Sequence, residues 1–195
     1  MKKNSFQKAS QTKLPPQPDL DIVDPIVLEN TRFSKDRAHR YTLFRYWGDP
    51  EHCCVFIGIN PSGADEVAID RTVNRCIEFA KAWKFGSTYV LNTFSLRATN
   101  SDELLNSTNP VGPKNDYWIR EIIRNAERVI AAWGEKGATR GRGQRLDKIL
   151  RENCDPDRVF CFGRNKDGSP KHPLYQPANQ PLIPYFDESE QVNSI

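Results

Sequence analysis

Apolar residues along this chain form short continuous runs that alternate with segments of helical spacing. Four runs, residues 53–59, 89–91, 129–134 and 159–163, contain no charged side chain, which is typical of strands buried on both faces of a parallel sheet. Residues 72–84 and 117–128 carry apolar side chains three and four positions apart, as amphipathic helices do, and residues 143–153 predict a third helix. This order predicts an α/β fold, a three-layer α/β/α sandwich around a mainly parallel central sheet.

Local signals set the expected ends of these elements. The aromatic-rich residues 41–47 are separated from the run 53–59 by a turn-forming Gly-Asp-Pro sequence, so we expect the two segments to form a hairpin. Asn115 or Asp116 suits the capping position of the helix that follows. Asp70 suits a helix start, where the helix dipole stabilises a carboxylate, better than a catalytic role.

Composition bounds the domain organisation and the location of the protein. Residues 1–25 are polar and proline-bearing and predict a flexible or draped N-terminal arm, whereas residues 26–195 are expected to form a single α/β domain. No run approaches the roughly 20 apolar residues of a membrane span. The chain start also lacks the apolar segment of a secretory signal. We therefore expect a cytoplasmic monomer with no membrane partner.

Cysteine usage argues against two kinds of site. The five cysteines are an odd number and show no Cys-x-x-Cys spacing, so reduced thiols are expected rather than a disulfide framework or a zinc site. No metal and no other cofactor is expected. The cysteines are Cys53, Cys54, Cys76, Cys154 and Cys161.

The predicted topology points to one ligand site. In parallel sheets, ligands bind at the carboxyl ends of the strands. Four segments fall there: residues 58–62, residues 92–94, residues 133–134 with the basic loop behind them, and the stretch after Gly163. We expect these segments to converge in space and to form a single site rich in amide side chains.

The loop after Gly134 concentrates positive charge in a chain whose net charge is only +3. Its glycines and guanidinium groups are suited to phosphate or nucleic acid, although a solvated loop at a helix start explains the same pattern. Both interpretations stay open. The candidate phosphate-binding residues are Arg140, Arg142 and Arg145, with Lys136 and Lys148 nearby.

The same four segments, in the same order, resemble the motifs of the uracil-DNA glycosylase superfamily. Residues 58–62 (Gly-Ile-Asn-Pro-Ser), 90–98, 129–134 and 172–175 (His-Pro-Leu-Tyr) carry this resemblance, which covers most of the expected domain. The sequence is still more similar to a bacterial and phage family, domain of unknown function 1643, in residues 70–73, 111–116 and 166–175.

The superfamily resemblance implies an N-glycosidase that acts on a base in DNA or on a nucleotide. Asn60 matches the residue that orients the attacking water, and His172 matches the histidine that faces the carbonyl oxygen of the departing base. Asn92 matches the residue that reads the base edge, and Leu174 or Tyr175 would fill the gap left by a flipped base. The other residues assigned to substrate binding are Gly58, Ile59, Pro61, Ser62 and Phe94.

Departures from the superfamily pattern support a second hypothesis. The efficient branch has an acid where this chain has Asn60 and a tyrosine where it has Ser62. A non-catalytic module that binds nucleic acid or a modified nucleotide fits these changes, and an enzyme of free nucleotides is a third alternative. Each key residue also has a structural explanation: Asn60 can shape the strand end, Asn92 can cap a turn, and Trp133 is expected to pack in the core or support the site.

Overall fold

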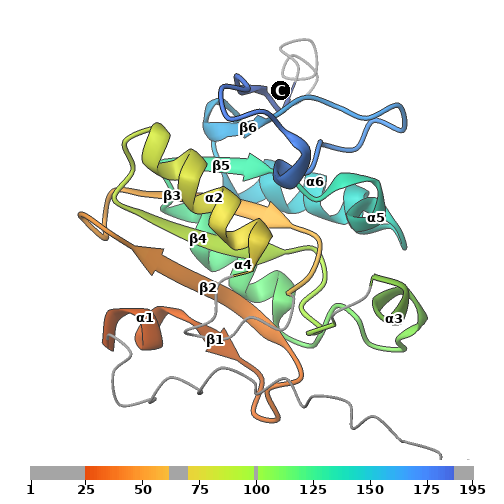
Figure 1. Cartoon of the computed structure of the whole chain (residues 1–195). Helices are drawn as coiled ribbons and strands as arrows, with labels where there is room; N and C mark the ends of the chain where they lie inside the picture. Colours follow the sequence, from red (N-terminus) through yellow and green to blue (C-terminus); the bar gives the residue numbers. More distant parts are fainter. Residues whose placement is uncertain (1–24, 62–69, 99–100, 187–195) are drawn as a thin grey trace, which may run out of the picture.

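The computed structural model describes residues 25–61, 70–98 and 101–186. The expected N-terminal arm therefore lies almost wholly outside the described residues, as does Ser62, one of the expected substrate-binding residues. Within these ranges the chain forms a mixed α/β fold around a seven-stranded sheet of order β1-β2-β4-β3-β5-β6-β7 (Figure 1). The strands are β1 (Arg32–Phe33), β2 (Arg40–Tyr46), β3 (Cys53–Gly58), β4 (Ser87–Asn92), β5 (Arg128–Ala131), β6 (Val159–Cys161) and β7 (Ile183–Pro184).

Parallel pairing is confined to the centre of the sheet. The strands β4, β3, β5 and β6 run parallel to one another, and the outer strands β1, β2 and β7 are antiparallel to their neighbours. The four apolar runs of the sequence are these four central strands. Buried on both faces, they carry no alternating polar positions, which explains why their pattern was continuous.

The predicted hairpin of residues 41–47 with residues 53–59 is wrong. Strand β4 lies between β2 and β3: it pairs antiparallel with β2, from Leu43 opposite Val90 onward, and parallel with β3, from Cys53 opposite Ser87 to Gly58 opposite Asn92. Because β3 is buried, the backbone N–H and C=O groups on both of its edges need hydrogen-bond partners, and parallel β4 and β5 supply them. The turn after β2 is instead held by Gly86, whose carbonyl accepts from the N–H groups of Trp47 and Gly48 at 2.9 and 3.0 Å.

Helices cover both faces of the sheet. The helix α2 (Arg71–Ala82) packs on one face, and α4 (Asn115–Arg124) and α6 (Arg142–Asn153) pack on the other (Figure 1). Strand β3 contributes to both cores, with Cys54 and Phe56 toward α2 and Val55 and Ile57 toward α4 and α6. The remaining helices are the short α1 (Pro25–Asn30), α3 (Ser101–Asn106) and α5 (Gly134–Ala138) and the 3-10 turns η2 (Pro156–Arg158) and η3 (Pro173–Tyr175).

The two predicted helix starts have different outcomes. The prediction for Asp70 is confirmed: it caps α2, where its carboxylate accepts from the backbone N–H of Val73 at 2.7 Å. The capping prediction for Asn115 or Asp116 is wrong, because Lys114 occupies that position without a side-chain bond. Asn115 is instead fully buried, and its amide donates to the carbonyls of Asn92 and Thr93 at 2.9 and 3.1 Å, which ties α4 to the end of β4.

The connections open a crevice at the carboxyl end of β3. The chain leaves β3 toward α2 on one face, whereas its neighbours β4 and β5 lead to α4 and α6 on the other face. Adjacent strands whose connections diverge in this way leave a gap above the sheet edge, where ligands of open α/β sheets bind. None of the helices in the described ranges is both long and apolar enough to cross a membrane.

Candidate functional site

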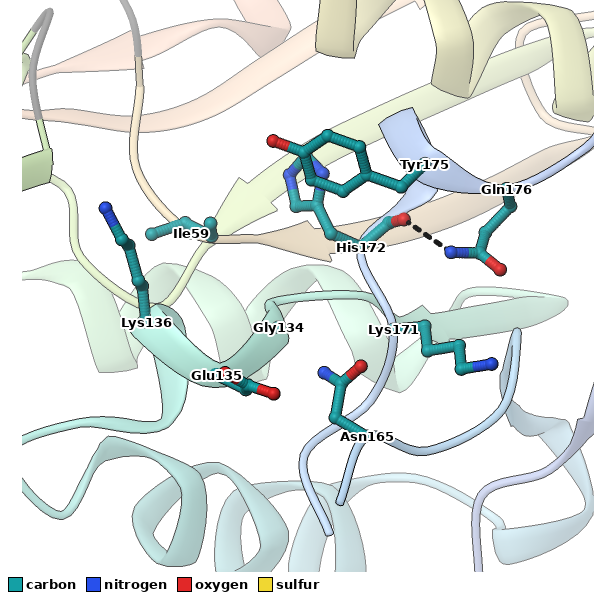
Figure 2. Close-up of a pocket in the computed structure, with 9 residues that line it drawn as sticks. All are labelled: Ile59, Gly134, Glu135, Lys136, Asn165, Lys171, His172, Tyr175 and Gln176. Carbon is teal, nitrogen blue, oxygen red and sulfur yellow. Dashed lines mark hydrogen bonds between the residues drawn. The ribbon is translucent and has the colours of Figure 1, made fainter. Parts of the chain in front are cut away.

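A cavity of about 540 Å³ lies at this crevice (Figure 2). It is open to solvent and combines one aromatic ring, one imidazole, two ammonium groups and one carboxylate. A volume of this size suits a drug-sized or nucleotide-sized ligand. The residues that line it are Ile59, Gly134, Glu135, Lys136, Asn165, Lys171, His172, Tyr175 and Gln176.

Backbone contacts join the segments that build the cavity. The N–H of Gly134, just after β5, donates to the carbonyl of Pro170 at 2.9 Å, and the N–H of Lys171 donates to that of Gly163 at 2.9 Å. Gly134 has φ of 61°, a left-handed conformation that glycine adopts without strain. The chain can therefore turn from β5 directly into α5 and still hold the segment that leads to His172.

His172 is the most strongly perturbed titratable group of the cavity. Its Nδ1 accepts from the backbone N–H of Leu174 at 3.4 Å, so the neutral ring carries its proton on Nε2. Burial lowers the pKa of His172 to about 4, and the opposing charge of Asp70 offsets only part of this effect. The imidazole is therefore neutral at pH 7 and offers one N–H donor.

Tyr175 and Gln176 complete the turn that carries His172. The Tyr175 ring lies beside the imidazole, with centroids 5.7 Å apart (Figure 2). Its side chain is exposed, with 80% of the residue surface accessible. The Gln176 amide donates back to the His172 carbonyl at 3.1 Å. An exposed aromatic ring at the mouth of a polar cavity is a surface on which a flat ring can stack.

Charged and amide groups line the other walls. Lys136 and Lys171 lie on opposite sides of the close-up, and Glu135 and Asn165 lie between them (Figure 2). The side chain of Lys171 lies beside Gly163, at ordinary van der Waals distance from where a Cβ would be. Two ammonium groups around an aromatic ring suit an anionic ligand with a flat ring.

Several of these lining residues were not predicted from the sequence. Glu135, Asn165 and Gln176 belong to none of the motifs described above, and Lys171 belongs only to the segment 166–175, for which no role was assigned. A signal was present, however, because Glu135 follows the third strand end and the other three follow Gly163, where the strand-end rule points.

Asn92 ends β4 opposite Gly58 of β3, but it is not among the residues that line the cavity. It is 4% exposed, and its amide nitrogen is one of the buried side-chain atoms in the described residues with no hydrogen-bond partner. Its oxygen lies 3.0 Å from where a Cβ of Gly58 would be, so only glycine at position 58 accommodates this side chain without displacement. An unmet buried donor costs about 1–3 kcal/mol, which makes this amide a candidate for contact with a ligand or water.

Asn60 is held in the strand-ending turn. Its side-chain nitrogen donates to the carbonyl of Pro61 at 3.0 Å and to that of Ala98 at 2.9 Å. Asn60 thus links the end of β3 to the loop after β4, and only its Oδ1 is left as a group that could orient a water. It does not line the cavity.

Some of the other candidates line the cavity and others do not. Ile59, His172 and Tyr175 line the cavity, whereas Leu174 and Pro61 do not. Phe94 is fully buried in a small cluster with Ala98 and Leu104, so it offers no free face for stacking. Trp133 packs in the core as expected, edge-to-face with Tyr185 at 5.6 Å between ring centroids.

The three candidate phosphate-binding arginines have partners within the fold. Arg142 has a side chain only 7% exposed; it pairs with Asp116 at 2.7 Å and donates to the Thr93 carbonyl at 3.0 Å. Arg145 pairs with the same carboxylate at 2.8 Å, and Arg140 donates to the Ser107 carbonyl at 2.9 Å. Burial opposes ionisation of Asp116, but the two guanidinium groups prevail and lower its pKa. These contacts anchor α6 to α4 and β4.

No metal-ligand cluster is built into this region. Within the residues that the structure describes, no group of three or more His, Cys, Asp or Glu side chains gathers as a metal site. All five cysteines are free, and only Cys53 is not fully buried. Burial raises the pKa of the Cys54 thiol to about 12, which keeps it protonated.

The structure is thus an open α/β protein with a cavity at the carboxyl ends of its parallel strands. Comparison with known families identifies it further: residues 40–174 match the family described as protein of unknown function (DUF1643), so the chain belongs to the DUF1643 family. The match runs from β2 to η3 and contains Asn60, Asn92 and His172. No curated protein and no solved structure matches the chain.

Proposed function

We propose that this protein is an N-glycosidase that releases a nucleobase from DNA or from a nucleotide. The single observation that carries the proposal is the state of His172. Its imidazole is neutral, its Nδ1 is occupied by the Leu174 N–H, and its ring lines the cavity with Nε2–H as the remaining donor.

This donor matches what N-glycosidic cleavage needs. When the bond between C1′ and the base nitrogen breaks, its electron pair stays on the base, and negative charge develops on a carbonyl oxygen of the ring. A fixed N–H donor stabilises that charge. Because the imidazole is already neutral, it can donate this hydrogen bond without a change in its protonation state. Water then adds to C1′, and the proton that it loses compensates the charge of the released base.

Base recognition is assigned to Tyr175 and Asn92. The exposed Tyr175 ring can stack on a base, an interaction worth about 1–3 kcal/mol per base. The unpaired amide nitrogen of Asn92 could donate to a carbonyl of the base edge. Lys136 and Lys171 are the candidate phosphate contacts, in place of the arginines that pair within the fold.

The groups available to activate a water favour a second candidate function. The amide nitrogen of Asn60 is bound by two backbone carbonyls, and the sole carboxylate among the cavity-lining residues is the exposed Glu135. A cavity that stacks and pairs with a base but lacks a well-placed base catalyst suits a module that binds nucleic acid or a modified nucleotide without cleaving it.

Base release from defined substrates separates the two functions. Purified protein is incubated with single- and double-stranded DNA that carries uracil, mismatched thymine, hypoxanthine or modified pyrimidines, and with free nucleotides; products are identified by mass spectrometry. His172→Ala and Asn60→Ala are compared with His52→Ala, a matched control at the opposite end of β3, where His52 pairs with Glu127.

The glycosidase predicts free base from one substrate class, lost in His172→Ala and kept in His52→Ala. The thermal midpoint of His172→Ala should stay close to that of wild type, because the only bond its ring makes to the turn is the long one from the Leu174 N–H. Tight binding of one substrate with no product establishes the binding module instead. Release that persists in His172→Ala contradicts the mechanism.

A further inference from the structure

Arg75, on α2, contacts the turn that carries His172. One nitrogen of its guanidinium donates to the carbonyl of Gln176 at 2.6 Å, across 101 positions of sequence. The other terminal nitrogen pairs with Glu78 at 2.8 Å, and the group lies over the Phe79 ring, with its Cζ 4.5 Å from the centroid. Three contacts therefore fix the orientation of one side chain.

The helix beneath Arg75 is a rigid support. Asp70 caps its first turn, and its apolar side packs on the sheet and against Phe162. Phe79, on which Arg75 lies, is itself part of this core and stacks 5.5 Å from Trp83. The buried residues of α2 are Val73, Cys76, Ile77, Phe79 and Ala80.

The turn that Arg75 contacts, η3, packs against α2, and its own backbone bonds are local. Its preceding segment is fixed by the backbone bond from Lys171 to Gly163. Within the turn, the N–H of Tyr175 donates to the His172 carbonyl at 3.3 Å and that of Gln176 donates to Pro173 at 3.2 Å. These internal bonds shape the turn but do not attach it to the sheet or to α2.

We propose that Arg75 is a positioning residue for this site: by holding the Gln176 carbonyl against α2, it places His172 and Tyr175 at the cavity. The inference rests on the proposed function for what His172 does there, but the placement itself is open to measurement in the free protein. Arg75 does not line the cavity, so it acts through the turn and not on a ligand.

Arginine is suited to this position by its geometry. The planar fork presents separate N–H groups to the Glu78 carboxylate and to the Gln176 carbonyl while its face stacks on Phe79. A lysine ammonium lacks the flat face and the fixed fork, so it can replace only part of the arrangement.

Nuclear magnetic resonance of the histidine rings tests the placement without any substrate. The chain has three histidines, so each ring can be assigned and followed through a pH titration of the 195-residue chain. In wild type, His172 should titrate near pH 4. In Arg75→Met, the released turn exposes the ring, and its pKa should move toward the ordinary value of about 6.5.

Two further variants control for general effects. Arg124→Met removes an equivalent arginine with an (i, i+3) glutamate partner on α4, and it should leave His172 unchanged. Glu78→Gln removes only the ion pair and should have a small effect. A folded Arg75→Met protein whose His172 titrates as in wild type overturns the proposal, as does a Glu78→Gln protein that shifts His172 equally.

If Arg75→Met does not fold, Arg75→Gln replaces it. Glutamine keeps a polar side chain on α2 but is too short to reach the Gln176 carbonyl. The pKa of His172 should therefore rise as it does in Arg75→Met, and an unchanged pKa overturns the proposal. Arg75→Lys should restore part of the wild-type titration, because an ammonium group can still donate to that carbonyl.

Kinetics separate this inference from the proposed function. If wild type releases a base, Arg75→Met should lower kcat by about 10- to 100-fold with a smaller change in KM, because misplacement of a reacting group weakens the transition state more than binding. If wild type releases none while His172 still shifts in Arg75→Met, the glycosidase fails and the positioning role stands. Release with unchanged kcat in Arg75→Met overturns the positioning role alone.

Discussion

The rings of His172 and Tyr175 face each other across one turn, with centroids 5.7 Å apart and planes inclined by 49°. The two rings differ in exposure, since the imidazole is mostly buried and the phenol ring is open to solvent. A ligand that approaches this wall of the cavity therefore meets an aromatic face first and a single N–H donor behind it.

Replacement of Tyr175 by alanine should weaken ligand binding and leave the fold intact. The exposed ring contributes little to the core, so the free energy of unfolding should change by less than about 0.5 kcal/mol. Loss of one stacked base should lower affinity by about 10- to 100-fold. Binding titrations and urea unfolding measure the two effects. Tyr175→Phe keeps the stacking face and is the control; if it weakens binding equally, the hydroxyl group matters and not the stacking.

Stability should fall in mildly acidic solution because of His172. Its folded pKa of about 4 lies below the value of about 6.5 in an unfolded chain. Between these values only the unfolded chain takes up the proton. The free energy of unfolding is therefore fully retained above about pH 6.5 and decreases by about 1–3 kcal/mol as pH falls to about 4.

The contribution of His172 to this pH dependence can be isolated by substitution. Burial also lowers the pKa of His39, which adds a decrease of the same sign. Unfolding curves of wild type and His172→Gln across this range should therefore both decline, with the shallower decline in the variant. If the two free energies of unfolding decline in parallel with pH, His172 has the same pKa in the folded and the unfolded protein.

The arginines of the basic loop should differ in their effect on stability. Arg142→Met breaks a buried ion pair and leaves the Thr93 carbonyl without this donor, which should cost about 3–4 kcal/mol. Arg145→Met removes a side chain that is 40% exposed and should cost less than about 1 kcal/mol. Chemical denaturation of both variants tests this order, with Arg140→Met as a surface control. If Arg142→Met is as stable as wild type, its ion pair is not structural.

A methyl group at position 58 should disturb the site more than the fold. The added carbon of Gly58→Ala would lie 3.0 Å from the Asn92 oxygen, so the buried amide must shift. We expect a destabilisation of about 1–2 kcal/mol and a larger relative loss of ligand affinity. Asn92→Ala in the same background is the control. If Gly58→Ala weakens binding further when Asn92 is already alanine, the added methyl group acts by another route.

The sequence predicted the central strands and the main helices, because burial on both faces and helical spacing leave local patterns. It did not predict which strands are neighbours. Residues 41–47 and 53–59 satisfy every local rule for a hairpin, but the pairing is decided by β4, more than 25 residues further along. The short outer strands β1 and β7, two residues each, carry no periodic signal.

The site was predicted in part for the same kind of reason. The strand-end rule located the cavity, and Ile59, His172 and Tyr175 were among the expected residues. Burial could not be foreseen for Arg142, because its partner Asp116 lies 26 positions away. Nor could the sequence indicate that the amide nitrogen of Asn60 is bound to the carbonyls of Pro61 and Ala98.

The position of β4 between β2 and β3 also determines the order in which the sheet can assemble. During synthesis, residues 40–58 emerge before residues 87–92, so β2 has only the two-residue β1 as a partner, and β3 has none, until β4 follows. Pairing between segments distant in sequence slows folding and leaves apolar edges open to other chains meanwhile. Strands β2 and β3 thus depend on segments that follow them in the chain for protection from aggregation.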